Sequence, residues 1–201
     1  MIYRRINYEE EANAFLDEYM RKTGKGIGPP VPIEQVVEVV SGFDVLYDNS
    51  ELNQNESGRT DFRNRVITVR VDEVQARQRF SLAHEGGHTR LHADKVDFLT
   101  QPIPGLCRDY SRPHLSRRGS RGWYEVEANK FAAAILMPVR FLRPAFEKAK
   151  EQYQDLGGNS EQLLGMITAD LARQFRVSQE AMSYRLKNTR LLEELYMRRL
   201  F

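Results

Sequence analysis

One stretch of the sequence decides how the rest of the chain is interpreted: Phe80-Ser-Leu-Ala-His-Glu-Gly-Gly-His-Thr-Arg-Leu-His92. Two of its histidines, His84 and His88, are four residues apart. On an α-helix such side chains project from one face, one turn apart. That separation allows two imidazoles to bind one tetrahedral Zn²⁺ ion. The stretch therefore predicts a helix that carries two ligands of a metal ion.

Glu85 lies beside the first histidine and can reach a metal-bound water without binding the metal itself. Zinc lowers the pKa of that water to about 7, and a nearby carboxylate can pass its proton to a leaving amine. His-Glu-x-x-His is thus the signature of zinc peptidases. The alternative is a pair of solvent-facing histidines on an amphipathic helix. We favour the metal site because two of the 4 histidines fall inside the motif and a second acidic motif follows.

The two glycines inside the motif, Gly86 and Gly87, each cost a helix about 1 kcal/mol relative to alanine. Such a cost is tolerated where the backbone passes close to another element. We therefore expect this helix to pack tightly beneath a sheet or against another helix. The alternative is that the helix ends or kinks at the glycines, which would spoil the geometry of the two histidines.

A catalytic zinc ion needs a third protein ligand and an open position, and the candidates lie in the segment 123–138. Small residues in this segment allow close approach to a second helix. Glu125 and Asn129 are four apart and share one face. Glu125 could bind the metal while the Asn129 amide holds a histidine ring nitrogen from behind. Glu127 points elsewhere and suits a solvent-facing or structural role better, so we prefer Glu125 as the third ligand.

The rest of the chain predicts helices, a small sheet and then more helices, which is an α+β fold. We expect helices over 8–23, 33–40, 72–92 (with Asp72 as N-cap), 123–137, 139–154, 160–175 and from Ser178 onward, a strand over 43–47, and a hairpin over 59–70 that turns near Arg63-Asn64. The segment 93–121 has no clear periodicity. We divide the chain into a catalytic domain, 1–155, and a helical C-terminal region, 156–201.

The composition is that of an ordinary globular protein, with 41% hydrophobic and 29% charged residues and a formal charge of +2. This charge is too small to indicate a protein that coats nucleic acid. The single cysteine, Cys107, cannot form an internal disulfide and suits a reducing cytosol. No run approaches 18 apolar residues, and the acidic start is unlike a signal peptide. We expect a cytoplasmic protein with no membrane partner.

The chain resembles the ImmA/IrrE family of metallopeptidases in two blocks, His-Glu-Gly-Gly-His at 84–88 and Glu-Val-Glu-Ala-Asn-Lys-Phe-Ala-Ala-Ala-Ile-Leu-Met-Pro at 125–138. The second block is the more distinctive, because generic zinc peptidases do not share it. A similar layout extends from about residue 8 to 190. One departure is Gly86, where the family more often has an apolar residue.

The resemblance implies a thermolysin-like minimal zincin fold, with a small sheet packed on the zinc helix. It implies His84, His88 and Glu125 as zinc ligands and Glu85 as the general base. The same ligand set accepts Mn²⁺ or Fe²⁺. Known family members cleave helix-turn-helix transcriptional repressors and so relieve repression of stress, phage or mobile-element genes. A protein substrate of that kind is the expected partner.

The C-terminal region supports a second hypothesis. Apolar spacing from Leu171 to Leu186 fits a helix-turn-helix, with Ser178 capping the second helix. Alone, this would indicate a DNA-binding transcriptional regulator with a structural or vestigial metal site. However, Arg176 occupies the turn position where glycine is usual, and residues 171–201 carry seven basic against three acidic residues. DNA is therefore a candidate partner that we do not favour.

Four further features have less specific interpretations. We expect His92 to be structural or to support a ligand, because a fourth ligand would close the open site. The basic segment 105–122 is either a solvated loop, which we prefer slightly, or a lid that recruits an acidic partner. The strand 65–70 is either a sheet edge that takes a peptide substrate or a core strand. Candidate oxyanion donors are Tyr110, His114 and Tyr124.

Overall fold

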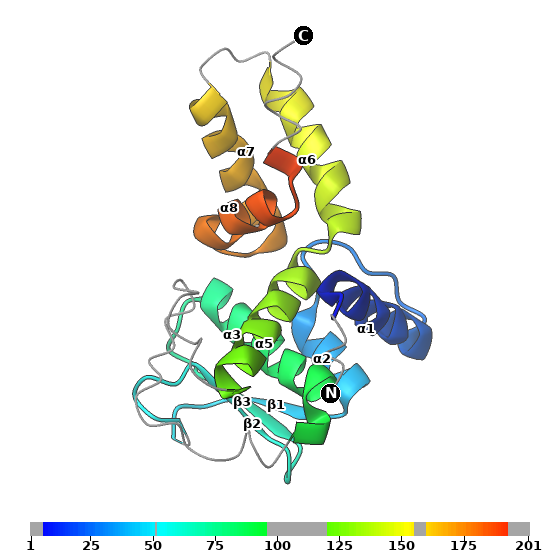
Figure 1. The fold of residues 1–201 in the computed structure, drawn as a ribbon, viewed down its shortest axis with the longest axis vertical. Coiled ribbons are helices and arrows are strands. Elements are labelled where there is room, and N and C mark those ends of the chain that lie inside the picture. The colour runs from blue at the N-terminus through cyan, green and yellow to red at the C-terminus, as the bar shows by residue number, and fades with distance from the viewer. Residues whose placement is uncertain (1–5, 51, 96–119, 155–159, 193–201) are drawn as a thin grey trace.

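The computed structural model describes residues 6–50, 52–95, 120–154 and 160–192, and within them it contains seven α-helices and a three-stranded sheet (Figure 1). The helices are α1 (Tyr8–Thr23), α2 (Ile33–Ser41), α3 (Gln75–Leu91), α5 (Ser120–Leu136), α6 (Val139–Gln154), α7 (Ser160–Phe175) and α8 (Gln179–Asn188), and a 3-10 helix, η1, spans Ala93–Lys95. The strands are β1 (Asp44–Tyr47), β2 (Gly58–Asp61) and β3 (Val66–Val69). This composition confirms the α+β class.

Helix α1 has the bounds that the sequence predicts, because both of its ends are encoded locally. The Asn7 side chain accepts hydrogen bonds from the backbone N–H groups of Glu9 and Glu10. At the other end Gly24 has φ 69°, the left-handed conformation that closes a helix without strain. The first turn is acidic and the last turn basic, as the helix dipole favours.

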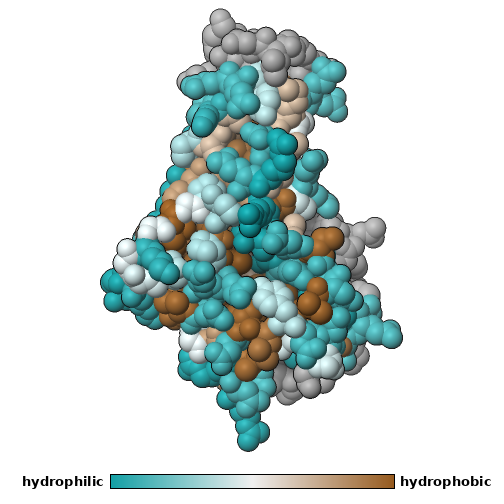
Figure 2. Space-filling model, turned by 180° about the vertical axis from the view of Figure 1, so that it is seen from behind, coloured by the Kyte–Doolittle hydropathy of each residue, from teal (hydrophilic) through white to brown (hydrophobic). Residues whose placement is uncertain are grey.

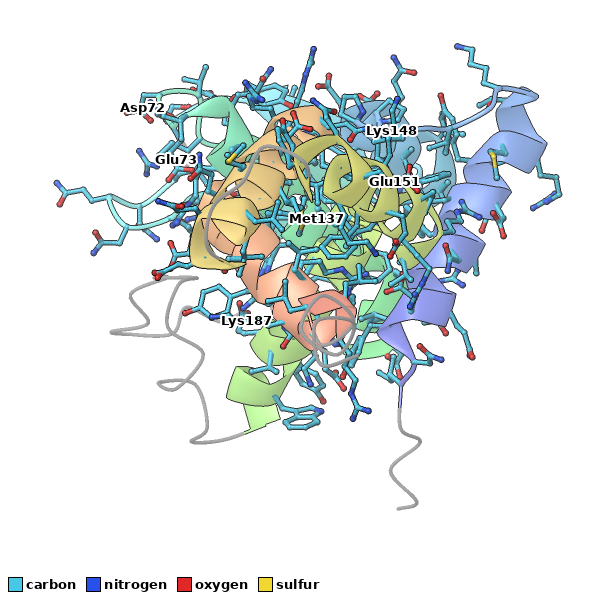
Figure 3. The ribbon with its side chains drawn as sticks, turned by 90° about the horizontal axis from the view of Figure 1, so that it is seen from above. Asp72, Glu73, Met137, Lys148, Glu151 and Lys187 are labelled. Carbon is cyan, nitrogen blue, oxygen red and sulfur yellow. The ribbon has the colours of Figure 1, made fainter. Side chains whose placement is uncertain are left out.

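Helix α3 begins three residues later than we expected, so the prediction that Asp72 is its N-cap is wrong. The N-cap is Val74, and no side chain caps this end. The Gln78 amide donates hydrogen bonds to the carbonyls of Arg70 and Val71. These bonds hold the turn that follows β3, and the helix begins only after it, at Gln75. Asp72 lies at the margin of the molecule in the view from above (Figure 3).

The sheet has the strand order β1-β3-β2, with β1 parallel and β2 antiparallel to β3. The β2–β3 hairpin turns at the expected place, where the Asp61 carboxylate accepts hydrogen bonds from the N–H groups of Arg63 and Asn64. Strand β3 is central, and Ile67 and Val69 are fully buried. Of the two interpretations of the strand 65–70, the core strand is confirmed and the sheet edge is wrong. The other side of β3 is occupied by β1, and among the described strands β1 and β2 are the outer ones.

Helix α3 is the centre of the lower part of the molecule in Figure 1, where it contacts α2, α5, β2 and β3. Its residues 81–88 are all buried. The small sheet packs on this helix, as expected. Helix α1 covers α5 and α2 from the side. His84, Glu85 and His88 of α3 are thus held inside the protein and not on its surface.

Helices α6, α7 and α8 form the upper part of the molecule in Figure 1. Ser178 caps α8, as predicted, by accepting a hydrogen bond from Ala181 N–H at 3.1 Å. Arg176 in the preceding turn has φ 52°, a left-handed conformation usual for glycine. The predicted boundary between 1–155 and 156–201 falls at 155–159, outside the described residues, and stays a prediction. In the described residues, no helix is both long and apolar enough to cross a membrane.

The two parts are joined through Glu9 of α1. One of its carboxylate oxygens accepts a hydrogen bond from Val139 N–H at 2.6 Å, which caps the start of α6. The other forms an ion pair with Arg185 of α8. The Arg185 guanidinium also donates to the Met137 carbonyl at 2.9 Å, and Met137 lies near the middle of the view in Figure 3. Arg185 is therefore buried and structural. Figure 2 shows the molecule from behind relative to Figure 1, and on that face several apolar groups lie among hydrophilic residues.

Candidate metal centre

Two glycines of α3 bring this helix close to its neighbours. A Cβ atom on Gly87 would lie 3.2 Å from Ala128 Cα and 3.2 Å from Phe131 Cδ1, both on α5. A Cβ atom on Gly86 would lie 2.9 Å from Val37 Cγ2 on α2. The expected tight packing is confirmed, and the helix continues past both glycines to Leu91. The Val37 side chain fills the space that an apolar residue at position 86 would need.

The close approach of α3 and α5 brings three ligand-type side chains together. His84 Nε2 lies 3.1 Å from His88 Nε2. The Glu125 carboxylate lies 3.1 Å from His84 Nε2 and 3.5 Å from His88 Nε2. One ligand atom from each of the three lies within 4.8 Å of the others. Two atoms that bind a tetrahedral Zn²⁺ at 2.0–2.1 Å lie about 3.3 Å apart. The three side chains therefore have the spacing that one small cation requires.

The charge of this group also suits a divalent cation. Burial raises the pKa of Glu125, but the charges and polar contacts of His84 and His88 outweigh burial and hold the pKa well below 4.5. Burial lowers the pKa of His84, but the hydrogen bond and charge of Glu125, with the charge of Glu85, raise it above 6.5. A charged carboxylate thus faces two imidazoles, and a proton on His84 is what a metal ion would displace.

Glu85 lies next to this group without belonging to it. Its carboxylate is 6% exposed and accepts a hydrogen bond from the Thr60 hydroxyl of β2 at 2.7 Å. Gly58, on the same strand, lies so close that a Cβ atom there would be 3.2 Å from Glu85 Cγ. The structure therefore places Glu85 between the metal-type group and the β2 edge of the sheet.

Asn129 lies behind His84, as the sequence predicts. Its Oδ1 atom is 2.9 Å from His84 Nδ1. Because an amide oxygen can only accept, His84 Nδ1 must carry the proton and donate. The lone pair of Nε2 is then directed away from Asn129, toward His88 and Glu125.

Glu127 and His92 form a second buried pair instead of contributing to the metal-type group. His92 Nε2 lies 2.9 Å from Glu127 Oε2, and the two side chains are 2% and 7% exposed. The Trp123 indole N–H donates to Glu127 Oε1 at 2.8 Å. Of the two roles weighed for Glu127, the structural one fits, because the carboxylate is buried. The preference for Glu125 over Glu127 agrees with this arrangement.

Sequence reasoning did not single out Thr60, Tyr8 or Trp123. Thr60 is 25 residues from Glu85, so only the packing of β2 on α3 brings them together. Tyr8 hydrogen-bonds Glu127, and burial together with that carboxylate raises the pKa of Tyr8 to about 12. No local motif marks Thr60 or Tyr8.

Tyr124, one of the candidate oxyanion donors, packs on His92, with ring centroids 4.8 Å apart. Cys107, Tyr110, His114 and the basic segment up to residue 119 lie outside the described residues.

Comparison with known proteins identifies the class to which this fold and site belong. The model of the peptidase M78 family, described as the IrrE N-terminal-like domain, matches residues 40–187, more than half of the chain. The chain belongs to this family, and the resemblance to ImmA/IrrE metallopeptidases is thereby confirmed. The match includes all of α3 and α5.

A solved structure and the curated proteins give two further results. A Mycobacterium tuberculosis transcriptional regulator has a similar fold, with a TM-score of 0.55 and 19% sequence identity. The similarity covers 90% of this chain and 47% of that one, so this chain spans about half the length of its structural relative. Among curated proteins the comparison finds no match.

Proposed function

We propose that this protein is a metal-dependent endopeptidase in which His84, His88 and Glu125 bind the metal and Glu85 is the general base. One observation carries the proposal: ligand-type atoms of His84, His88 and Glu125, on two helices, converge at 3.1–3.5 Å, with a second carboxylate, that of Glu85, beside them. When both imidazoles are neutral, their lone pairs and the Glu125 carboxylate repel one another unless a cation lies between them. Membership of a peptidase family supports the same interpretation.

Zinc is the metal that we expect, and the same side chains accept Mn²⁺ or Fe²⁺. When bound, such an ion polarises a carbonyl group and makes a water acidic enough to lose its proton near neutral pH. Glu85 would take that proton and deliver it to the amine that leaves. Thr60 occupies one Glu85 oxygen and so holds the carboxylate in one orientation. Asn129 would keep the His84 lone pair directed at the metal.

The β2 strand is the part of the sheet that we propose to bind the substrate. Among the described residues it pairs with β3, and an extended peptide can bind a sheet as an added strand. Thr60 of this strand hydrogen-bonds Glu85, and Gly58 lies close beside it. A peptide bound along β2 would therefore pass beside the base. This replaces the strand 65–70 as the substrate edge.

We propose a protein substrate, and specifically a helix-turn-helix transcriptional repressor, as the family resemblance implies. The similar solved chain is named a transcriptional regulator, which supports a role in the control of transcription. The test is to incubate the protein with the repressor encoded beside its own gene, with and without a chelator. We expect one discrete cut that the chelator prevents.

Two variants distinguish the proposed roles. Glu85→Gln should keep the metal and lose cleavage, because only the base is removed. His88→Ala should lose both. Elemental analysis of the purified proteins provides the metal content. A wild-type protein without stoichiometric zinc, manganese or iron would refute the proposal.

DNA binding through α7 and α8 is the second candidate function, favoured by the Ser178 cap and the helix–turn–helix order. Two contacts weigh against it. Arg185, on the presumed recognition helix, is buried against Glu9 and Met137 and cannot reach a phosphate. The exposed positions of α8 include both Glu180 and Lys187, which leaves no net positive charge there. A salt-dependent shift of duplex DNA that Lys187→Glu abolishes would favour this function instead.

A further inference from the structure

A chain of buried hydrogen-bonding groups extends behind His88, on the side away from the metal-type group. His88 Nδ1 lies 3.0 Å from His92 Nδ1. His92 Nε2 lies 2.9 Å from Glu127 Oε2, and Trp123 N–H donates to the other Glu127 oxygen at 2.8 Å. His88, His92 and Glu127 are 5%, 1% and 5% exposed. The chain thus leads from a presumed ligand to a carboxylate that α5 and α1 hold in place.

The chemistry of the groups permits one arrangement of protons along this chain. An ionised carboxylate can only accept, so His92 Nε2 must donate to Glu127. A neutral imidazole with its proton on Nε2 has a lone pair on Nδ1, so His88 Nδ1 must donate to His92. His88 Nε2 is then left with its lone pair, directed at His84 and Glu125.

The opposite arrangement would leave two acceptors facing each other in the interior. If His92 carried its proton on Nδ1, its Nε2 lone pair would face the Glu127 carboxylate at 2.9 Å. An unsatisfied buried acceptor costs about 1–3 kcal/mol, and more when it is charged. Apolar side chains in the place of this pair would avoid the burial of a charge altogether. The buried Glu127 carboxylate is therefore not needed for packing alone, and its specific effect is to fix the proton of His92 on Nε2.

We propose that Glu127 and His92 are positioning residues that set the tautomer of His88, so that its Nε2 lone pair faces the metal site. The proposal rests on the function proposed above for the identity of that site as a metal centre. Asn129 does the same for His84 with a neutral acceptor. The two ligands differ because His88 is supported by a charge, which makes its Nε2 a stronger donor to a cation.

The variant Glu127→Gln tests the proposal because it reverses the direction of the hydrogen bonds between residue 127, His92 and His88. With the Gln oxygen accepting from Trp123, its NH₂ group faces His92 Nε2 and needs a lone pair there. The proton of His92 moves to Nδ1 and donates to His88 Nδ1, so the His88 proton moves to Nε2. The matched control is Tyr8→Phe, which removes one donor from Glu127 but keeps its charge.

The readout is long-range ¹H–¹⁵N NMR of the imidazoles in the metal-free protein at pH 8. We expect the Nδ1–H tautomer of His88 in the wild type and in Tyr8→Phe, and the Nε2–H tautomer in Glu127→Gln. Zinc affinity, measured by chelator competition, should fall about 10–100-fold in Glu127→Gln alone. The wild-type spectrum needs no variant to fold, and an Nε2–H tautomer of His88 in it would overturn the proposal.

The two proposals fail separately. Unchanged His88 tautomer and unchanged zinc affinity in a folded Glu127→Gln protein would overturn the positioning role while the metal site stands. A wild-type protein that binds no metal would overturn the proposed function, although the NMR experiment on the metal-free protein would still report the tautomers.

Discussion

Replacement of Gly87 by alanine should destabilise the protein, although alanine is the better helix former. The added Cβ atom would lie 3.2 Å from Ala128 Cα and 3.3 Å from the Ala128 carbonyl oxygen. Both atoms belong to the backbone of α5, so the helix itself must move. Overpacking of this kind costs about 1–3 kcal/mol, against about 1 kcal/mol gained in helix propensity. We expect a net loss of up to about 2 kcal/mol in the free energy of unfolding.

Gly165→Ala is the matched control, because it lies in helix α7 and a Cβ atom there would meet nothing within 4 Å. This change should stabilise the protein by about 1 kcal/mol. The propensity gain is common to both variants, so the difference between them isolates the packing of α3 on α5. Urea unfolding of the metal-free proteins measures it. If Gly87→Ala stabilises the protein as much as Gly165→Ala does, the inferred contact between the two helices is refuted.

Three further predictions concern the site. Thr60→Val should lower kcat about tenfold without loss of metal, because Glu85 loses the hydrogen bond that orients it, and elemental analysis with peptidase kinetics checks this. Asn129→Ala should weaken zinc binding about tenfold, as measured by chelator competition, because His84 loses its acceptor. The third concerns pH. The raised pKa of His84 stabilises the metal-free protein below about pH 6.5, and this stabilisation is lost as the pH rises through the raised pKa. The lowered pKa of Glu125 stabilises the metal-free protein above about pH 4.5, and this stabilisation is lost as the pH falls through the lowered pKa. Because zinc must displace the His84 proton, the zinc-induced rise in Tm should be larger at pH 8 than at pH 5.5. An equal rise at both values would contradict this assignment.

The sequence predicts those features of the site that depend on one helix at a time. The spacing of His84 and His88 and the spacing of Glu125 and Asn129 are consequences of helix geometry. The same is true of α1, whose cap residues lie next to it in the chain. Asp72 shows the limit of such reasoning. It has the chemistry of a cap, but contacts made by Gln78 decide where α3 begins.

Features that depend on how two elements meet could not be predicted. The strand order places β3 between β1 and β2, and the parallel pairing of β1 with β3 has no local signal. The pairing of His92 with Glu127 depends on the rotation of α5 relative to α3. That rotation is set by the contact of Gly87 with Ala128 and Phe131. In the sequence, only the presence of Gly86 and Gly87 inside a helix indicates that such a contact exists.

The Arg185 contacts have a consequence for how the chain can be divided. This one guanidinium joins the first helix, the end of the helix that carries Glu125, and the last described helix. A chain cut after residue 155 would leave the Glu9 carboxylate and the Met137 carbonyl without it. The part of the chain that holds α1 to α5 and the C-terminal helices therefore share their stability, and a protein that pulls α8 away while binding would loosen the helix that carries Glu125.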